Sequence, residues 1–123
     1  MQIGTEVWDT GSHWASGNPA RLTVQSGEGG VWLIIAQVSW ASNAVGLRWL
    51  GIELNSSSFI AMNYNNPGGS ISSTRELNCS VIWNAAAGDY FRAICYQSSG
   101  GALNALATTH EGASLMMVRL SGT

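Results

Sequence analysis

The sequence contains very little charge and no lysine. Five arginines stand against seven acidic residues among 123, so the formal net charge is −2 and 10% of the residues are charged; a typical soluble domain has about 25%. Such a chain offers no basic surface for a polyanion, which argues against nucleic acid or an anionic membrane as a partner. To stay dissolved, it must cover itself with uncharged polar residues or hide apolar surface in an oligomer.

Long apolar runs and secretory features are also missing. No run approaches the roughly 18 apolar residues of a membrane-spanning helix, so we expect no insertion into a membrane. The first six residues lack the basic-then-apolar pattern of a secretory signal. We therefore expect either a domain of a longer protein or a protein that leaves its cell without a signal, as virion proteins do.

Cysteine is scarce, with only Cys79 and Cys95 in the chain. Their spacing fits no metal or redox motif. Both lie in apolar, strand-like surroundings, which favours two buried free thiols. The alternative is a disulfide between strands or sheets, because both residues are equally far from Ala87 in the turn between them.

The motifs of common enzyme classes are absent as well. Ser, His and Asp occur, but no nucleophile elbow or paired-carboxylate pattern is present, and the glycine-rich segments fit hairpin turns rather than a phosphate loop. His13 and His110 lie in predicted loops, and no local spacing resembles a zinc or calcium site. We expect no catalytic residue, no metal and no cofactor, with a polysaccharide hydrolase as the minor alternative.

The most informative segment present is 30–40, a charge-free run of β-branched and aromatic residues. Its composition predicts a buried central strand. Shorter segments of similar character are separated by turn-rich stretches, and no window has a helical period. The pattern predicts one all-β domain over 1–123, a sandwich, jelly roll or barrel, with further strands at 5–8, 21–24, 46–54, 59–62, 76–83, 90–97 and 114–120.

A set of segments in a fixed order carries a family resemblance. They are Arg-Leu-Thr-Val at 21–24, the run at 30–40, Gly-Leu-Arg-Trp-Leu-Gly-Ile-Glu-Leu-Asn at 46–55, Ala-Gly-Asp-Tyr-Phe-Arg-Ala at 87–93, Tyr-Gln-Ser-Ser-Gly-Gly-Ala-Leu at 96–103 and Ser-Leu-Met-Met-Val-Arg-Leu at 114–120. Together they resemble the C1q/TNF-like jelly-roll superfamily. More narrowly, they are similar to the versions in bacteriophage tail and fibre proteins and in bacterial collagen-like proteins. The chain departs from that pattern by its tryptophans in the central strand and by having no Gly-X-Y stalk.

The resemblance implies a ten-stranded jelly roll that assembles as a tight homotrimer. It also implies a binding head on a virion tail or fibre, or on an extracellular protein. Composition favours an oligomer independently, because six tryptophans are more than one small core easily hides.

Both faces of the central strand are mostly apolar. The even-numbered residues 32–40 form one face and the odd-numbered residues 31–39 the other. This is explained if one face packs in the core and the other meets neighbouring subunits, the alternative being a covering loop of the same chain. On 90–97, alternate residues pair aromatic rings with Arg92, which is typical of interfaces. The candidate interface residues are Trp32, Ile35, Trp40, Tyr90 and Tyr96.

Three predicted loops, at 9–19, 63–73 and 98–112, are the candidates for a ligand surface. Their aromatic and amide groups suit saccharides, and the candidate binding residues are Trp14, Tyr64, Asn65, Asn66 and His110. We expect a non-enzymatic trimeric head, such as a tail-fibre tip, that binds a saccharide or protein on a host cell surface. The alternative is a structural trimerisation or virion-decoration module that binds no ligand.

Overall fold

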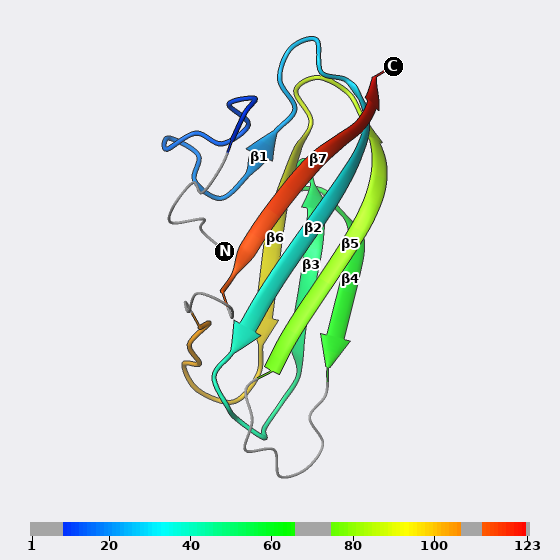
Figure 1. The fold of residues 1–123 in the computed structure, drawn as a ribbon. Coiled ribbons are helices and arrows are strands. Elements are labelled where there is room, and N and C mark those ends of the chain that lie inside the picture. Colours follow the sequence, from blue (N-terminus) through cyan, green and yellow to red (C-terminus); the bar gives the residue numbers. More distant parts are fainter. Residues whose placement is uncertain (1–8, 66–74, 107–111, 123) are drawn as a thin grey trace.

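The computed structural model describes residues 9–65, 75–106 and 112–122. In these residues all regular structure is β, and no helix is long and apolar enough to cross a membrane. Seven strands form two antiparallel sheets, in the orders β1-β6-β3-β4 and β5-β2-β7, which pack face to face as a sandwich (Figure 1). The strands are β1 (Leu22–Thr23), β2 (Gly30–Trp40), β3 (Arg48–Leu54), β4 (Ser58–Asn65), β5 (Arg75–Ala85), β6 (Tyr90–Gln97) and β7 (Ser114–Gly122).

The described residues thus form seven strands, where the resemblance implied ten. The all-β sandwich is confirmed, but the strand number is not. The segment predicted at 5–8 lies outside the described residues, and β1 is reduced to two residues. In the described part of the stretch between β6 and β7, the only regular pairing consists of isolated bridges, among them the one between Ala105 and Trp40.

Most connections between strands switch from one sheet to the other. Only β3 and β4 form a local hairpin, whereas the other five of the six connections join strands of different sheets. Neighbouring strands are therefore distant in sequence. The central strand β2 pairs along its full length with β5 and along most of it with β7.

The core lies between the two sheets and is built by strict alternation. From Trp32 to Trp40, every even-numbered residue of β2 is at most 5% exposed. Leu50 and Ile52 of β3 and Phe91 and Ala93 of β6 complete the centre of this cluster. The even-numbered face of β2 is thus the inward one, which alternation along the sequence alone left open.

Cys79 and Cys95 are free thiols. They lie on β5 and β6, in different sheets, and both pack against the core. Burial raises the pKa of the Cys79 thiol above its usual range, although a hydrogen bond with the backbone of Ile52 opposes the shift. The favoured prediction of two free thiols is confirmed, and the disulfide is not formed.

Arg48 is an unexpected member of the interior, because its side chain is 1% exposed. Its guanidinium donates hydrogen bonds to the carbonyl oxygens of Val45 (2.8 Å), Leu47 (3.1 Å) and Asn43 (3.4 Å). A buried charge needs such partners. From the interior, Arg48 therefore holds the loop between β2 and β3 in place.

Candidate functional site

The outer surface of the three-stranded sheet has an aliphatic centre, bordered by exposed polar residues such as Asn78, Ser80 and Asn84 of β5. Ile82 of β5 and Val118 of β7 flank Leu33 of β2, and Met116 lies opposite Ile35. Ile82 is 62% exposed, Met116 46% and Val118 41%, and the two β2 residues between them are half-buried. We call these five residues the aliphatic face.

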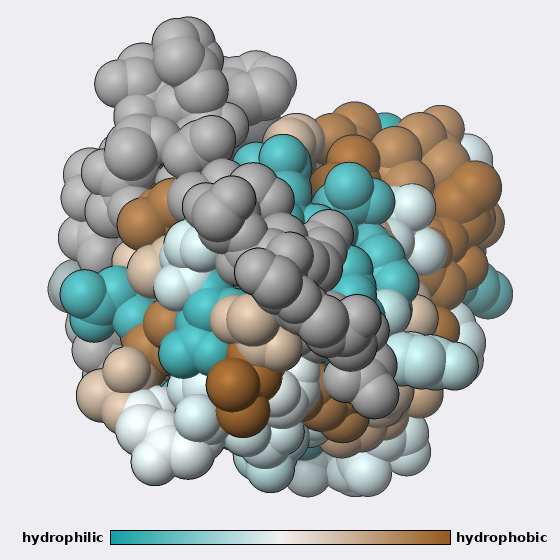
Figure 2. All heavy atoms as spheres, turned by 90° about the horizontal axis from the view of Figure 1, so that it is seen from below, coloured by the Kyte–Doolittle hydropathy of each residue, from teal (hydrophilic) through white to brown (hydrophobic). Residues whose placement is uncertain are grey.

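No charged side chain interrupts the aliphatic face. The parts of the three strands that carry it, 31–37, 78–84 and 114–118, contain no Asp, Glu, Lys or Arg. Viewed from the end where β2 and β4 finish, apolar surface gathers in the upper part of the molecule, on the side of this sheet (Figure 2). A contiguous, uncharged apolar face of this kind is typical of a contact surface between proteins.

The outer surface of the four-stranded sheet is aromatic instead. Tyr96, Trp49 and Tyr64 occupy opposing positions on β6, β3 and β4, so they form a row across three strands. Trp49 lies 5.7 Å from Tyr96 in a stacked arrangement and 5.3 Å from Phe59 edge to face, measured between ring centroids. We call Trp49, Phe59, Tyr64 and Tyr96 the aromatic face.

A glycine makes room for the packing of this face. A Cβ on Gly51 would lie 2.7 Å from Cδ1 of Phe59 and 3.3 Å from the carbonyl oxygen of Ala61. Only glycine therefore lets the Phe59 ring lie over β3 and reach Trp49. On the aromatic face Phe59 and Tyr96 pack against Trp49, whereas the aliphatic face is not covered by any described residue of the chain.

Polar contacts cluster where the aromatic face meets the β3–β4 turn. Arg92 forms an ion pair with Glu53 (Nε–Oε2, 3.1 Å) and donates a hydrogen bond to Oγ of Ser56 (2.9 Å). The Tyr90 hydroxyl donates to the same Ser56 oxygen at 3.1 Å. The Arg21 guanidinium lies over the Tyr90 ring, 4.4 Å from its centroid, a cation–π contact.

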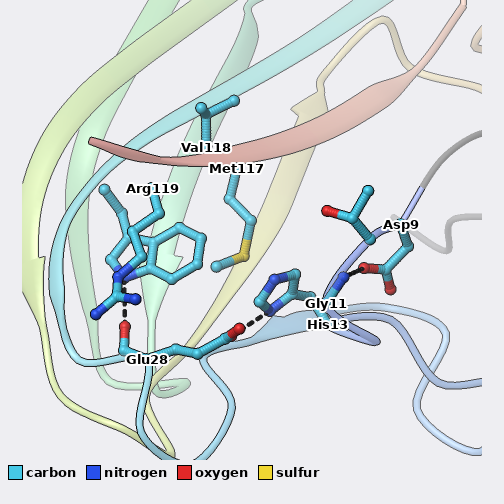
Figure 3. A pocket seen from close by; sticks show the side chains of 9 residues that line it. Asp9, Gly11, His13, Glu28, Met117, Val118 and Arg119 are labelled. Atoms are coloured by element: carbon cyan, nitrogen blue, oxygen red, sulfur yellow. Dashed lines mark hydrogen bonds and ion pairs between the residues drawn. The ribbon is translucent and has the colours of Figure 1, made fainter. Parts of the chain in front are cut away.

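A hollow of about 330 Å³ lies between the 9–13 loop and β7 (Figure 3). Met117 points into it from β7, and the Glu28 side chain reaches toward His13 across its floor. Nδ1 of His13 lies 3.0 Å from the Thr23 carbonyl oxygen and 3.5 Å from Oε2 of Glu28. Because a carbonyl oxygen only accepts, Nδ1 carries a hydrogen. The His13 ring also packs edge to face on Trp32.

Asp9 shapes one wall of this hollow. Its carboxylate accepts hydrogen bonds from the backbone N–H groups of Gly11 (3.1 Å) and Trp14 (2.9 Å). Burial acts to raise the pKa of Asp9, but these bonds, a further backbone bond from His13 and the nearby His13 charge lower it below its usual value. Both oxygens are thereby engaged in holding the loop.

The hollow has a histidine next to a carboxylate, but the described contacts join Nε2 of His13 to no hydroxyl nucleophile. In the described residues, no three His, Cys, Asp or Glu side chains are grouped to hold a metal. The contacts of Asp9 and His13 therefore hold the 9–14 loop in place, and the hollow is a small recess lined by polar groups.

The five predicted interface residues do not share one surface. Trp32 (3% exposed) and Trp40 (5%) belong to the core of the chain, so their assignment to an interface is wrong. The reason is that both faces of β2 are apolar, and alternation alone does not say which faces inward. Ile35 lies on the aliphatic face, whereas Tyr90 and Tyr96 lie on the opposite sheet.

The predicted ligand residues are also separated. Tyr64 (71% exposed) and Asn65 lie at the end of β4 rather than in a loop, because they continue the pairing with Trp49 and Arg48. Trp14 is half-buried in the loop before β1, toward the other end of the sandwich (Figure 1). Asn66 and His110 lie outside the described residues.

Sequence reasoning did not identify Arg21, Ser56 or Glu28 as site residues. Arg21 and Ser56 are 35 positions apart, and only the side-by-side placement of the loop before β1 and the β3–β4 turn brings them to Tyr90. The turn contains two consecutive residues with left-handed backbone, Asn55 (φ 53°) and Ser56 (φ 55°). In the sequence, only the turn-like composition Asn-Ser-Ser-Ser indicated this turn.

The sequence matches no model of a known protein family. It also has no match among curated proteins.

Proposed function

We propose that the chain is a non-enzymatic β-sandwich head that assembles through its aliphatic face into a homotrimer and binds a cell-surface saccharide. The single observation that carries the proposal is the uncharged aliphatic face. In the setting that the resemblance implies, the head belongs to a virion fibre or to an extracellular protein.

The aliphatic face suits contact with further copies of the same chain. An uncharged surface meets its own copy without repulsion between like charges, and it offers few directional groups that a different partner would need to match. Closed symmetric assembly of identical chains is the usual outcome of such self-complementarity. Burying the exposed parts of Ile82, Met116 and Val118 contributes about 1 kcal/mol for each side chain.

The assembly is tested by a charge placed on the aliphatic face, at Val118 of β7. We expect the wild-type chain to have three times the 13.0 kDa mass of one chain by light scattering at micromolar concentration. Val118→Lys should weaken association about 100-fold or more and give monomers, because an unpaired ammonium group would be buried at the contact.

Met62→Lys is the matched control. Met62 lies on β4 in the other sheet and is 50% exposed, so the same substitution there should leave the mass unchanged. Circular dichroism verifies that both variants are folded. A wild-type monomer at micromolar concentration, or equal dissociation of both variants, would contradict the assembly.

The saccharide part of the proposal is supported by the β4 end of the aromatic face. Tyr64 presents an exposed ring, and Asn65 follows it with an amide that donates and accepts hydrogen bonds. Binding to a glycan array should be lost in Tyr64→Ala while the trimer mass is unchanged.

The second candidate is a structural trimerisation module without a ligand. The separation of Trp14 from the end of β4 favours it, because no single loop surface joins the predicted binding groups. Absence of any array signal for the wild-type trimer would support the structural module, whereas retention of every signal in Tyr64→Ala would overturn the placement of the saccharide site at the end of β4.

A further inference from the structure

We propose that the small pocket between Arg21 and Arg92 binds an anionic group, namely a carboxylate, sulfate or phosphate carried by a saccharide. The inference rests on the proposed saccharide-binding function and names the class of sugar, an acidic one. The pocket lies at the end of the sandwich where β6 begins (Figure 1) and has a volume of about 210 Å³. That volume suits the charged end of a sugar better than a large ligand.

The lining of the pocket contains two cations and no anion among the described residues. Its wall consists of the loop residues 17–21 together with Ser56, Tyr90 and Arg92. Two of the five arginines of the chain converge here, although the chain as a whole has a net charge of −2. The Glu53 carboxylate is the counter-ion of Arg92 and does not line the pocket.

Arg21 is the cation that lacks a partner. In the described part of the chain, its guanidinium makes no ion pair, and its Nε is buried without a hydrogen-bond acceptor. Leaving a buried donor unpaired is unfavourable, and an acceptor on a ligand would relieve it. The Tyr90 ring holds the guanidinium in place, so an arriving anion would find Arg21 already positioned.

Ser56 and Arg92 supply further donors. The Ser56 oxygen accepts hydrogen bonds from both Tyr90 and Arg92, so its own hydroxyl hydrogen remains available to a ligand. Arg92 uses Nε and one terminal nitrogen in its contacts with Glu53 and Ser56. Its second terminal nitrogen makes no contact with the described residues that would compete with an anion.

The turn that carries Ser56 is held in a fixed conformation. Asn55 and Ser56 both have positive φ, which non-glycine residues adopt only when their surroundings enforce it. The enforcing contacts come from the Asn55 amide, which donates to Asp89 at 2.8 Å and accepts from the Tyr90 backbone N–H at 2.9 Å. The Ser56 hydroxyl is thereby presented at a constant place beside the two arginines.

The hollow between the 9–13 loop and β7 has the opposite character. Asp9 and Glu28 both line the recess of Figure 3 beside a single arginine, Arg119, so it disfavours an anion. Arg119 therefore provides a control for the loss of one positive charge elsewhere on the chain.

The test measures binding of glucuronate, glucose and inorganic sulfate to the full chain by NMR titration. Glucuronate and sulfate should bind saturably and compete with each other, and glucose should not bind at the pocket. Arg21→Gln should weaken glucuronate binding at least tenfold, and Arg21→Lys should weaken it less, since it keeps the charge but loses the planar donor fork. Arg119→Gln should change it less than twofold.

Sulfate and glucuronate also distinguish a bare anion from an acidic sugar. Tighter binding of glucuronate than of sulfate supports a sugar-borne carboxylate, and equal binding of glucose overturns the anionic pocket. Equal losses in Arg21→Gln and Arg119→Gln would also overturn it, because they would show attraction by net charge alone. The mass of the same samples is read separately, so an intact trimer without anion binding refutes this inference and leaves the assembly standing.

Discussion

The two outer faces of the sandwich differ in how much of their surface the chain already uses. On the aromatic face, Trp49 contacts two other rings, and Glu53 and Arg92 neutralise each other nearby. On the aliphatic face, Ile82 and Val118 remain exposed without a covering segment among the described residues. Trp49 of the aromatic face is thus packed within one chain, whereas the aliphatic face is the surface for which we propose contact between chains.

The difference between the two faces separates two proposed roles, assembly and ligand recognition, which the amino-acid composition does not distinguish. Low charge and many aromatic residues both suggest an oligomer, yet in the fold they belong to opposite sides. Aliphatic side chains give non-directional adhesion, whereas guanidinium, hydroxyl and amide groups give direction and choice of ligand. Assembly and recognition can therefore be disrupted independently.

The largest effect should come from removing the centre of the aromatic face. Trp49→Ala should lower the free energy of unfolding by about 2–3 kcal/mol, because a half-buried ring and its contacts with Phe59 and Tyr96 are lost. Urea unfolding at one protein concentration measures it. Ile82→Ala, compared in the dissociated chain, should cost less than about 1 kcal/mol, and similar costs for both would remove the distinction between the faces.

A smaller effect should appear as a dependence of stability on protein concentration. If the aliphatic face joins the chains, each tenfold increase in protein should stabilise the wild type by about 1 kcal/mol, since association favours the folded state by mass action. The thermal midpoint, recorded from micromolar to higher concentrations, shows the dependence. Ile82→Ser should flatten it, whereas Tyr96→Ser should not.

The smallest effect concerns the 9–14 loop, which borders β7 but belongs to neither face. Because the pKa of Asp9 is lower in the fold than in the unfolded chain, its stabilising contribution is complete above the unfolded value of about 3.9. That contribution is lost as the pH falls through the lower folded value. The amide NMR shifts of Gly11 and Trp14 should therefore change below about pH 4, but not in Asp9→Asn.

The same acid titration also tests the independence of the faces. The amide signals of Ile82 and Trp49 should remain unchanged where those of the loop move. A simultaneous change across both sheets would show that the loop and the sandwich are one cooperative unit.

Sequence patterns predicted most of the strands well, because burial repeats every second residue and leaves a local signature in β2 and β6. They left open which face of β2 points inward, so Trp32 and Trp40 were assigned to an interface although they lie in the core. They failed where the answer depends on pairing between distant segments. Tyr64 and Asn65 resemble loop residues by composition and become strand residues only because β3 offers partners for their backbone.

Arg48 and the Arg21–Arg92 pocket illustrate the same limit. Nothing in the local sequence distinguishes the buried arginine Arg48 from exposed ones, since its partners are three carbonyl oxygens of an irregular loop. The pocket requires Arg21, Ser56 and Arg92 to meet from separate elements. The strand register and the sheet order decide both the burial of Arg48 and the formation of the pocket. The periodicity of apolar residues along the sequence contains neither.

The pairing of β2 with β7 has a consequence for biosynthesis. Until Ser114–Gly122 has been made, the most apolar strand of the chain has a partner only on its β5 side, with its other backbone edge open. At ~5–20 residues per second, a ribosome takes roughly 2–6 s to pass from the end of β5 to the start of β7. During those seconds the nascent chain presents an unpaired edge that invites pairing with another chain.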